Sequence, residues 1–163
     1  MCHAKLASLQ GVRYLSFLLT MKKVVIINGP NLNLLGTREP EIYGHQTFDA
    51  IFNELKMAFP QLEITSFQSN IEGELVTAIQ QFSLNQDALV INPGGYSHYS
   101  IAILDALKAT QLPKVEVHLS NIYQREEYRT KSITAQACTG VISGFGKMSY
   151  TLALQYLQQE LEK

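Results

Sequence analysis

Residues 22–31 read Lys-Lys-Val-Val-Ile-Ile-Asn-Gly-Pro-Asn, and this stretch decides the fold. Its first part, 22–27, ends in a continuous apolar run, which is typical of a strand buried on both faces of a parallel sheet. Its second part, Asn28 to Asn31, is a turn signal that ends the strand. The same order recurs where the apolar run 88–91 is ended by Asn92-Pro-Gly-Gly95.

Helical patterns alternate with apolar strands along the rest of the chain. Thr47 is placed to cap one helix, and Asn70 to cap another. The alternation predicts an α/β fold, a flavodoxin-like open five-stranded parallel sheet with helices on both faces. The expected strands lie at about 22–27, 62–67, 88–91, 114–119 and 140–143, and the expected helices at 48–58, from Ile71 to Phe82, at 98–109 and from Leu152 to Leu161, with a helical turn at 125–128.

The chain of 163 residues is long enough for one domain with a substantial core. We expect residues 22–163 to form that domain and residues 1–21 to be an N-terminal extension outside it. The apolar run 14–19 is short and Thr20-Met21 is a poor cleavage site, so the sequence does not favour a secretion signal. No run approaches the roughly 20 apolar residues of a membrane-spanning helix.

Charge and cysteine content narrow the class of protein further. The formal net charge of -1 favours neither nucleic acid nor an anionic membrane as a partner. Cys2 and Cys138 are the two cysteines, and they give neither a disulfide framework nor the spacing of a metal site. A reduced cytoplasmic compartment is the simpler interpretation.

Residues 116–129, Glu-Val-His-Leu-Ser-Asn-Ile-Tyr-Gln-Arg-Glu-Glu-Tyr-Arg, carry the strongest chemical signal. Because side chains alternate along a strand, Glu116, His118 and Ser120 share one face. A carboxylate beside a histidine can orient a proton donor. The alternative is a purely structural pair, since a charged pair in a buried strand costs free energy unless it is satisfied.

Further polar residues are expected at one edge of the sheet, because ligands of open parallel sheets bind beyond the carboxyl ends of the strands. Arg125 and Arg129 stand four residues apart and can act together on an anion. Asn31 and Asn92 each follow a strand. Local turn chemistry is the alternative interpretation for both asparagines.

The loop 32–45, about 14 residues long, has the length of a functional lid or of a disordered segment. It contains Arg38 and Tyr43. A tyrosine ordinarily has a pKa of about 10 and needs a nearby cation, such as a guanidinium, to act as a base. A solvated loop without function is the alternative.

His98 and Asp105 are weaker candidates taken singly. His98 stands at the start of the expected helix 98–109, where a histidine is equally a cap or a surface residue. Asp105 follows two turns later, and an aspartate in that position is most often merely solvated.

Six motifs stand in order between about Lys22 and the end of the chain: Asn28-Gly-Pro-Asn-Leu-Asn-Leu-Leu-Gly36, Arg38-Glu-Pro40, Tyr43-Gly44, Gln68-Ser-Asn70, Ile91-Asn-Pro-Gly94 and Glu116-Val-His-Leu-Ser-Asn121. Together they resemble type II 3-dehydroquinate dehydratase. The resemblance implies reversible dehydration of 3-dehydroquinate to 3-dehydroshikimate, a step of the shikimate pathway towards aromatic amino acids. It also implies a flavodoxin-like fold, a homododecamer built as a tetramer of trimers, and no metal or cofactor.

The resemblance also implies a role for each candidate residue. Tyr43 is the base that removes the proton alpha to the ketone, Arg38 activates it, and Asn31 holds a water beside the enolate. His118 protonates the departing hydroxyl, and Glu116 holds its ring. The implied substrate-binding residues are Asn92, His98, Asp105, Leu119, Ser120 and Arg129.

Two departures from the family pattern bear on these roles. Asp105 is implied to reach the site of a neighbouring subunit, but Leu104 stands where the family usually carries an arginine. Tyr96 and Tyr99 stand where smaller residues are more usual, so the packing of the pocket is expected to differ. Arg125 is implied to order the lid.

Three other functions are alternatives to this one. A flavin-binding protein of the same fold class would be yellow, but the sequence lacks a Ser/Thr-rich phosphate loop after its first strand. A non-catalytic relative is disfavoured because every residue with a chemical role is present. A dehydratase that forms a lysine Schiff base would be inactivated by borohydride in the presence of substrate.

Overall fold

The computed structural model describes residues 21–37 and 45–163. Arg38 and Tyr43, and all but the last residue of the predicted extension 1–21, lie outside the described residues. The strands and α-helices are β1 (Lys22–Asn28), α3 (Phe48–Ala58), β2 (Leu62–Gln68), α4 (Glu72–Phe82), β3 (Ala88–Asn92), α5 (Ile101–Ala109), β4 (Lys114–His118), β5 (Gly140–Ser143) and α6 (Met148–Leu161). Short 3-10 helices are η1 (Leu32–Leu34), η2 (Gly94–His98), η3 (Ile122–Gln124), η4 (Glu127–Arg129) and η5 (Thr134–Ala137).

The five strands form one parallel sheet in the order β2-β1-β3-β4-β5. This confirms the predicted open five-stranded α/β fold. The strand order reverses between β1 and β3, where Asn28 lies in register with Asn92. In open α/β sheets the crevice at this reversal is where ligands bind.

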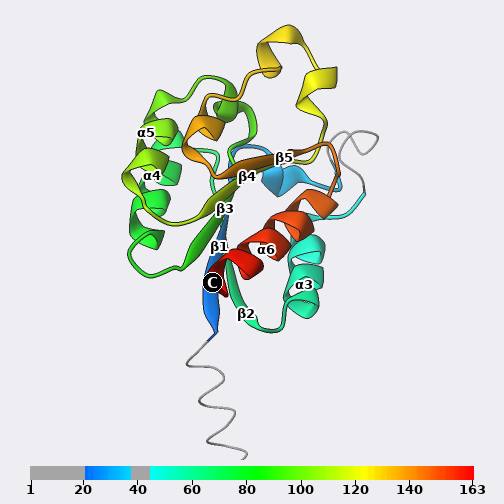
Figure 1. Cartoon of the computed structure of the whole chain (residues 1–163). Coiled ribbons are helices and arrows are strands. Elements are labelled where there is room, and N and C mark those ends of the chain that lie inside the picture. The colour runs from blue at the N-terminus through cyan, green and yellow to red at the C-terminus, as the bar shows by residue number, and fades with distance from the viewer. Residues whose placement is uncertain (1–20, 38–44) are drawn as a thin grey trace, which may run out of the picture.

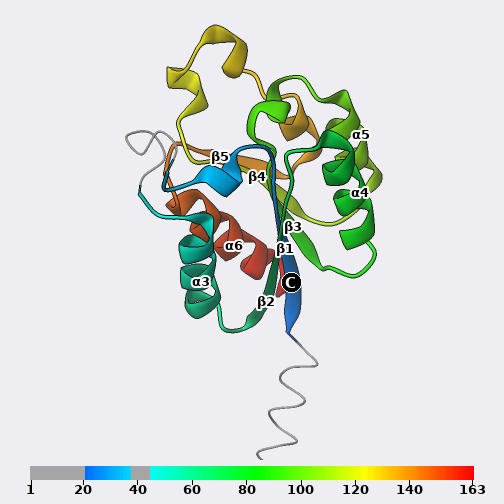
Figure 2. The ribbon, with the colours of Figure 1, turned by 180° about the vertical axis from the view of Figure 1, so that it is seen from behind.

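Helices cover both faces of the sheet (Figures 1 and 2). On one face Val24 and Ile26 of β1 pack in a cluster with side chains of α3 and α6. On the other face Val25 and Ile27 pack with side chains of α4 and α5. Each residue of this run is therefore fully buried, which explains why the strand is apolar throughout and not alternating.

The helix starts differ in part from those predicted. The Thr47 side chain caps α3 as expected and accepts from the Ala50 N–H at 3.2 Å. The prediction that Asn70 caps α4 was wrong, because its Oδ1 accepts the backbone N–H of Asn31 at 2.9 Å instead. Glu72 is the first residue of α4, and Ile71 is its N-cap.

The segment predicted as one helix over 98–109 divides into two. His98 ends η2, and α5 begins only at Ile101, where Ser100 caps it by accepting the N–H of Ile103. The turn expected at 125–128 divides as well, because Arg125 is extended between η3 and η4. His98 therefore ends a 3-10 helix, and Arg125 lies between two of them.

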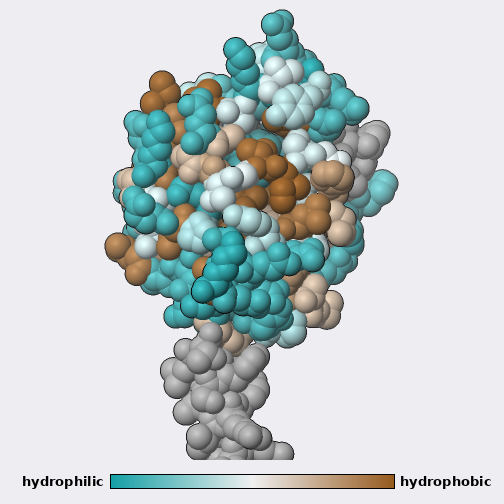
Figure 3. Space-filling model, viewed as in Figure 1, coloured by the Kyte–Doolittle hydropathy of each residue, from teal (hydrophilic) through white to brown (hydrophobic). Residues whose placement is uncertain are grey.

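The surface seen in Figure 3 is largely hydrophilic, with apolar residues gathered near β5 and the start of α6. Val141, Phe145 and Met148 of that region are exposed. Among the described residues, no helix has the length and apolar character that crossing a membrane requires.

Candidate active site

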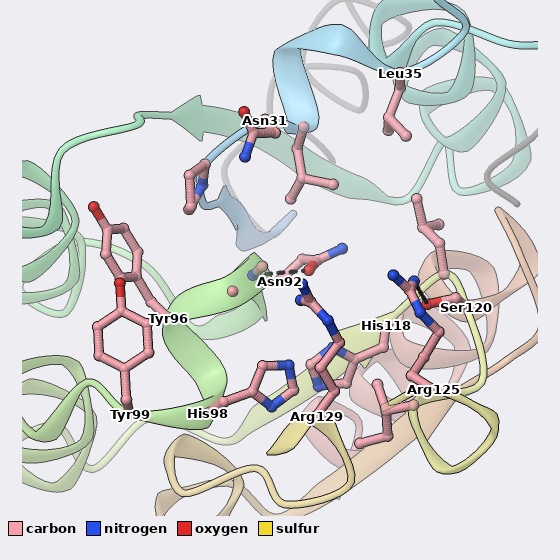
Figure 4. Close-up of a pocket in the computed structure, with 16 residues that line it drawn as sticks. Asn31, Leu35, Asn92, Tyr96, His98, Tyr99, His118, Ser120, Arg125 and Arg129 are labelled. Carbon is pink, nitrogen blue, oxygen red and sulfur yellow. Dashed lines mark hydrogen bonds between the residues drawn. The ribbon is translucent and has the colours of Figure 1, made fainter. Parts of the chain in front are cut away.

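A cavity of about 390 Å³ opens beyond the carboxyl ends of β1, β3 and β4 (Figure 4). Its walls come from the turn after β1, from η2 and from the loops that follow β4. The predicted residues that line it are Asn31, Asn92, His98, His118, Leu119, Ser120 and Arg129, together with Arg125. Segments nearly a hundred residues apart thus meet at the edge predicted from the strand pattern.

His118 and Glu116 form a buried pair at the end of β4. His118 Nε2 lies 2.7 Å from Glu116 Oε1, and the Glu116 side chain is fully buried. Because the carboxylate accepts the Nε2 proton, the other ring nitrogen, Nδ1, is the one free to exchange a proton with a ligand. The predicted contact between the two side chains is therefore present, with the histidine toward the cavity and the glutamate behind it.

His98 lies beside His118, with ring centroids 6.5 Å apart and planes inclined by 15°. Its Nδ1 lies 2.8 Å from the carbonyl oxygen of Lys131. Burial is the largest influence on its pKa, which is lowered, and the neighbouring His118 and Arg129 act in the same direction. A neutral His98 donates its Nδ1 proton to this carbonyl and presents Nε2 as an acceptor for a ligand hydroxyl.

Arg125 and Arg129 supply the positive charge of the cavity. Arg129 Nε donates to Glu126 Oε2 at 3.0 Å, and Arg125 Nη1 donates to Ser120 Oγ at 3.4 Å. The pKa of Glu126 is lowered by a hydrogen bond from its own backbone and then by the charges of these two arginines. Two guanidinium groups on one wall suit a carboxylate ligand.

Asn92 is fixed by a hydrogen-bonded network at the reversal point of the sheet. Its Nδ2 donates to the Tyr150 hydroxyl at 3.2 Å, and that hydroxyl donates to Asn28 Oδ1 at 2.7 Å. Asn92 Oδ1 also accepts the N–H of Gly94 at 3.2 Å. Complete burial raises the pKa of Tyr150, so the hydroxyl remains a donor.

Asn31 reaches the cavity from a tight turn with a left-handed backbone, φ 67°. This turn packs against the turn after β3, and the N–H of Gly29 donates to the Asn92 carbonyl at 2.7 Å. A Cβ at Gly29 would lie 2.3 Å from the Pro93 carbonyl oxygen, so only glycine fits. In Figure 4 Asn31 lies across the cavity from the two histidines.

Tyr96 and Tyr99 stand at the rim. Their rings meet edge to face at 5.7 Å, and the Tyr96 hydroxyl donates to the Asn70 carbonyl at 2.9 Å. Both line the cavity. Any change in packing that these two tyrosines cause therefore lies at the opening of the cavity.

Among the described residues, Asp105 is the predicted substrate-binding residue that does not line this cavity. It is exposed on α5 and does not line the cavity of its own chain. Sequence reasoning missed the partners behind the histidines, which are Ser132, Thr134 and the carbonyl of Lys131. Lys131 and Ser132 lie in the loop between η4 and η5, and Thr134 is the first residue of η5, so no periodicity marks them.

Within the described ranges, no group of three or more His, Cys, Asp or Glu side chains is placed to hold a metal ion. The candidate site offers hydrogen-bonding and proton-transfer groups, carried on strand ends, turns and short 3-10 helices.

The chain is similar to known proteins over most of its length. A family model described as "Dehydroquinase class II" matches residues 22–158. A 3-dehydroquinate dehydratase of Clostridium botulinum (strain Hall) is 53% identical over 143 residues, which cover 86% of this chain and 97% of the relative. A protein of the same name from Clostridium perfringens is 52% identical, with 86% of this chain and 98% of the relative covered.

Comparison with solved structures gives the same family. The crystal structure of a type II dehydroquinase from Butyrivibrio crossotus superposes with a TM-score of 0.83 at 42% identity, covering 85% of this chain and 99% of the other. The corresponding enzyme from Propionibacterium acnes gives a TM-score of 0.82 at 41% identity, covering 85% and 97%. The similarity therefore extends to both sequence and fold.

Proposed function

Because the chain belongs to the class II dehydroquinase family, we propose that it is a cytoplasmic hydro-lyase that converts 3-dehydroquinate reversibly to 3-dehydroshikimate in the shikimate pathway. The family membership confirms the resemblance inferred from the six motifs. The flavin-binding and non-catalytic alternatives are not favoured, since neither explains why the proton-transfer pair and the arginines share one cavity.

The observation that carries the proposal is the pair of His118 and fully buried Glu116 facing a cavity with two arginines. In the proposed reaction a base removes the proton alpha to the ketone and an enolate forms. The hydroxyl then leaves as water after it receives a proton. General acid–base catalysis of this kind typically contributes about 10²–10⁴-fold in rate.

We assign the acid step to His118. With Nε2 bound to Glu116, the ring can give the proton on Nδ1 to the departing hydroxyl, and the carboxylate stabilises the charged ring beforehand. After the step the ring is neutral, and its remaining proton, on Nε2, is still donated in a hydrogen bond to Glu116. The proton taken by the base restores the ring through solvent, so that the only product besides the enone is water.

We assign the base to Tyr43, with Arg38 as the cation that favours its phenolate form. Both lie in the loop outside the described residues, and their roles rest on the family motifs. Asn31, at the near end of that loop, is assigned to hold the water that hydrogen-bonds to the enolate oxygen.

The substrate carries a carboxylate and several hydroxyls. We assign the carboxylate to the backbone at Leu119 and Ser120, which follow β4 and line the cavity. Arg129 contributes positive charge to the same anion. Asn92 and His98 bind the ring hydroxyls, the first through its fixed amide and the second through Nε2.

We propose that the protein is a homododecamer, a tetramer of trimers, in which Asp105 reaches the cavity of a neighbouring subunit. The exposure of Asp105 on α5, away from its own cavity, is compatible with a contact to another chain. The apolar side chains exposed near β5 are of the kind that self-association buries.

The direct test is the reaction itself. Purified protein is incubated with 3-dehydroquinate, and the ultraviolet absorbance of the conjugated enone product is followed. We expect turnover without an added cofactor and no inactivation by borohydride in the presence of substrate. Absence of product would refute the function, while borohydride inactivation would point to a Schiff-base mechanism instead.

A further inference from the structure

Two hydroxyl groups contact the buried carboxylate of Glu116 in addition to His118. Thr134 Oγ1 donates to Glu116 Oε2 at 2.6 Å, and Ser132 Oγ donates to Oε1. Thr134 is fully buried, as is Glu116. Both carboxylate oxygens are thus occupied from the side that faces away from the cavity.

These contacts satisfy and orient the carboxylate. A buried carboxylate is costly unless hydrogen-bond donors satisfy it. Oε1 accepts from both His118 and Ser132, whereas Oε2 accepts from Thr134. With both oxygens held, the plane of the carboxylate is fixed and its acceptor lone pair points at His118 Nε2.

The segment that carries the two hydroxyls is itself docked on η2. The N–H of Ile133 donates to the Ser97 carbonyl at 2.8 Å, and the Lys131 carbonyl lies 2.8 Å from His98 Nδ1. Ser132 Oγ also accepts the N–H of Ala135 at 3.3 Å at the start of η5. A purely structural role, capping η5, is therefore the competing explanation for Ser132, though not for Thr134.

We propose that Ser132 and Thr134 are positioning residues that act through Glu116, holding it as a fixed acceptor so that His118 keeps its proton on Nε2 and presents Nδ1 to the cavity. The part of this inference that concerns turnover rests on the proposed function. The part that concerns the His118 tautomer does not.

The matched pair of variants is Thr134→Val, which keeps the shape and removes the hydroxyl, and Thr134→Ser, which keeps the hydroxyl. We expect Thr134→Val to lower kcat about tenfold, the effect of losing one hydrogen bond to a charged group, with little change in KM. Thr134→Ser should recover most of the rate. Ser132→Ala should behave like Thr134→Val, and Thr139→Val, at an exposed site of the same segment, should leave kcat unchanged.

The ¹⁵N signals of the His118 ring provide a readout that is independent of substrate, and His118→Asn identifies them. At a pH at which the ring is neutral, we expect one tautomer in the wild type, with the proton on Nε2. In the double variant Ser132→Ala/Thr134→Val we expect a mixture of the two neutral tautomers. Circular dichroism of each variant establishes that it is folded before the comparison is made.

A double-mutant cycle with Glu116→Gln separates action through Glu116 from general packing. If the hydroxyls act through the carboxylate, Thr134→Val should change kcat less than twofold in the Glu116→Gln background. The inference is overturned if Thr134→Ser loses as much as Thr134→Val, or if the double variant keeps a single Nε2–H tautomer. Suppose that the wild type has no dehydratase activity, yet shows the single Nε2–H tautomer that becomes a mixture in the double variant. That result would refute the proposed function and leave this inference standing.

Discussion

His98 and His118 stack with their ring centroids 6.5 Å apart, yet each ring is held by a different kind of acceptor. The carbonyl of Lys131 lies at 2.8 Å from His98, and the carboxylate of Glu116 at 2.7 Å from His118. Burial lowers the pKa of the His98 ring, whereas the partner of the His118 ring is an anion that fixes its orientation. Neighbouring titratable groups in different environments mark distinct roles, here a hydroxyl acceptor and a proton donor.

Removing the proposed proton donor should abolish most turnover. We expect His118→Asn to lower kcat by about 10²–10⁴-fold, because no other group replaces the acid step. Glu116→Gln should have a smaller effect of the same kind, since the ring stays but its charged form loses its partner. Initial rates with 3-dehydroquinate measure both.

The matched control for these variants is His98→Asn, which should raise KM more than it lowers kcat. If His98→Asn instead abolished kcat while His118→Asn retained it, the assignment of the acid to His118 would be wrong. Binding of substrate to inactive His118→Asn, followed by calorimetry, should remain close to that of the wild type.

The stability of the protein should depend on pH through His98. Burial lowers the pKa of its ring, so the unfolded chain takes up a proton at a higher pH than the folded chain does. The neutral His98 ring thus makes its full contribution to the free energy of unfolding above the pKa of the unfolded chain, about 6.5. That contribution is lost as the pH falls toward the lowered pKa of the folded chain. The melting temperature of the wild type should fall from pH 7.5 to pH 5.

The variant His98→Asn should show a flatter dependence over the same range, because the shifted group is gone. His45→Asn, at an exposed histidine, should keep the slope of the wild type. An equally steep fall in His98→Asn would show that other groups determine the acid sensitivity. Differential scanning calorimetry of the three proteins measures the slopes.

Much of the fold could be predicted from the sequence, because its apolar runs have a physical cause. Val24 to Ile27 are buried on both faces of the sheet, the environment in which a short strand is apolar throughout. The turns after β1 and β3 could also be predicted, from their Asn, Gly and Pro residues. Asn70 was misassigned because a polar residue before a helix is usually a cap, whereas here its oxygen accepts from the neighbouring turn at Asn31.

The site could be predicted where spacing within one element decides the contact. Glu116 and His118 stand two apart on a strand, so their pairing follows from the pleat. The contacts of Ser132 and Thr134 with Glu116 depend on how a loop folds back over β4, and no local pattern records that. Tyr150, whose hydroxyl joins Asn28 and Asn92, lies too far along the chain for its partners to be read from sequence.

Tyr43→Phe should retain the fold and lose turnover. The substitution removes only the phenolic oxygen that the proposed base step requires, so we expect kcat to fall by about 10²-fold or more with KM little changed. Arg38→Gln should lower kcat as well. The decrease in kcat should be smaller at higher pH, where the Tyr43 phenol ionises without a neighbouring cation. Near-normal turnover by Tyr43→Phe would contradict the base assignment while leaving the family assignment intact.

Asp105 offers a test of sites shared between subunits. Mixed oligomers of His118→Asn and Asp105→Ala chains, formed by unfolding and refolding both together, should be more active than either parent. Some cavities would then combine an intact His118 with an intact Asp105 from the neighbouring chain. If mixing gave only the average of the two parents, Asp105 would not act across an interface. Light scattering on the wild type measures the expected dodecamer independently.

Tyr150→Phe should destabilise the protein and weaken substrate binding together. The hydroxyl is completely buried, donates to Asn28 Oδ1 at 2.7 Å and accepts from Asn92 Nδ2 at 3.2 Å. Its removal leaves two buried amide groups without this partner, which costs about 1–3 kcal/mol per unsatisfied group.

Asn92 lines the cavity, so a freed amide should also raise KM through looser placement of the substrate hydroxyl, with kcat less affected. Urea denaturation measures the loss of stability, and initial rates measure KM. Tyr156→Phe, at a more exposed tyrosine of the same helix, is the matched control and should change neither quantity. A Tyr150→Phe protein with unchanged KM but lowered stability would mean that the Gly94 N–H alone suffices to fix the Asn92 amide.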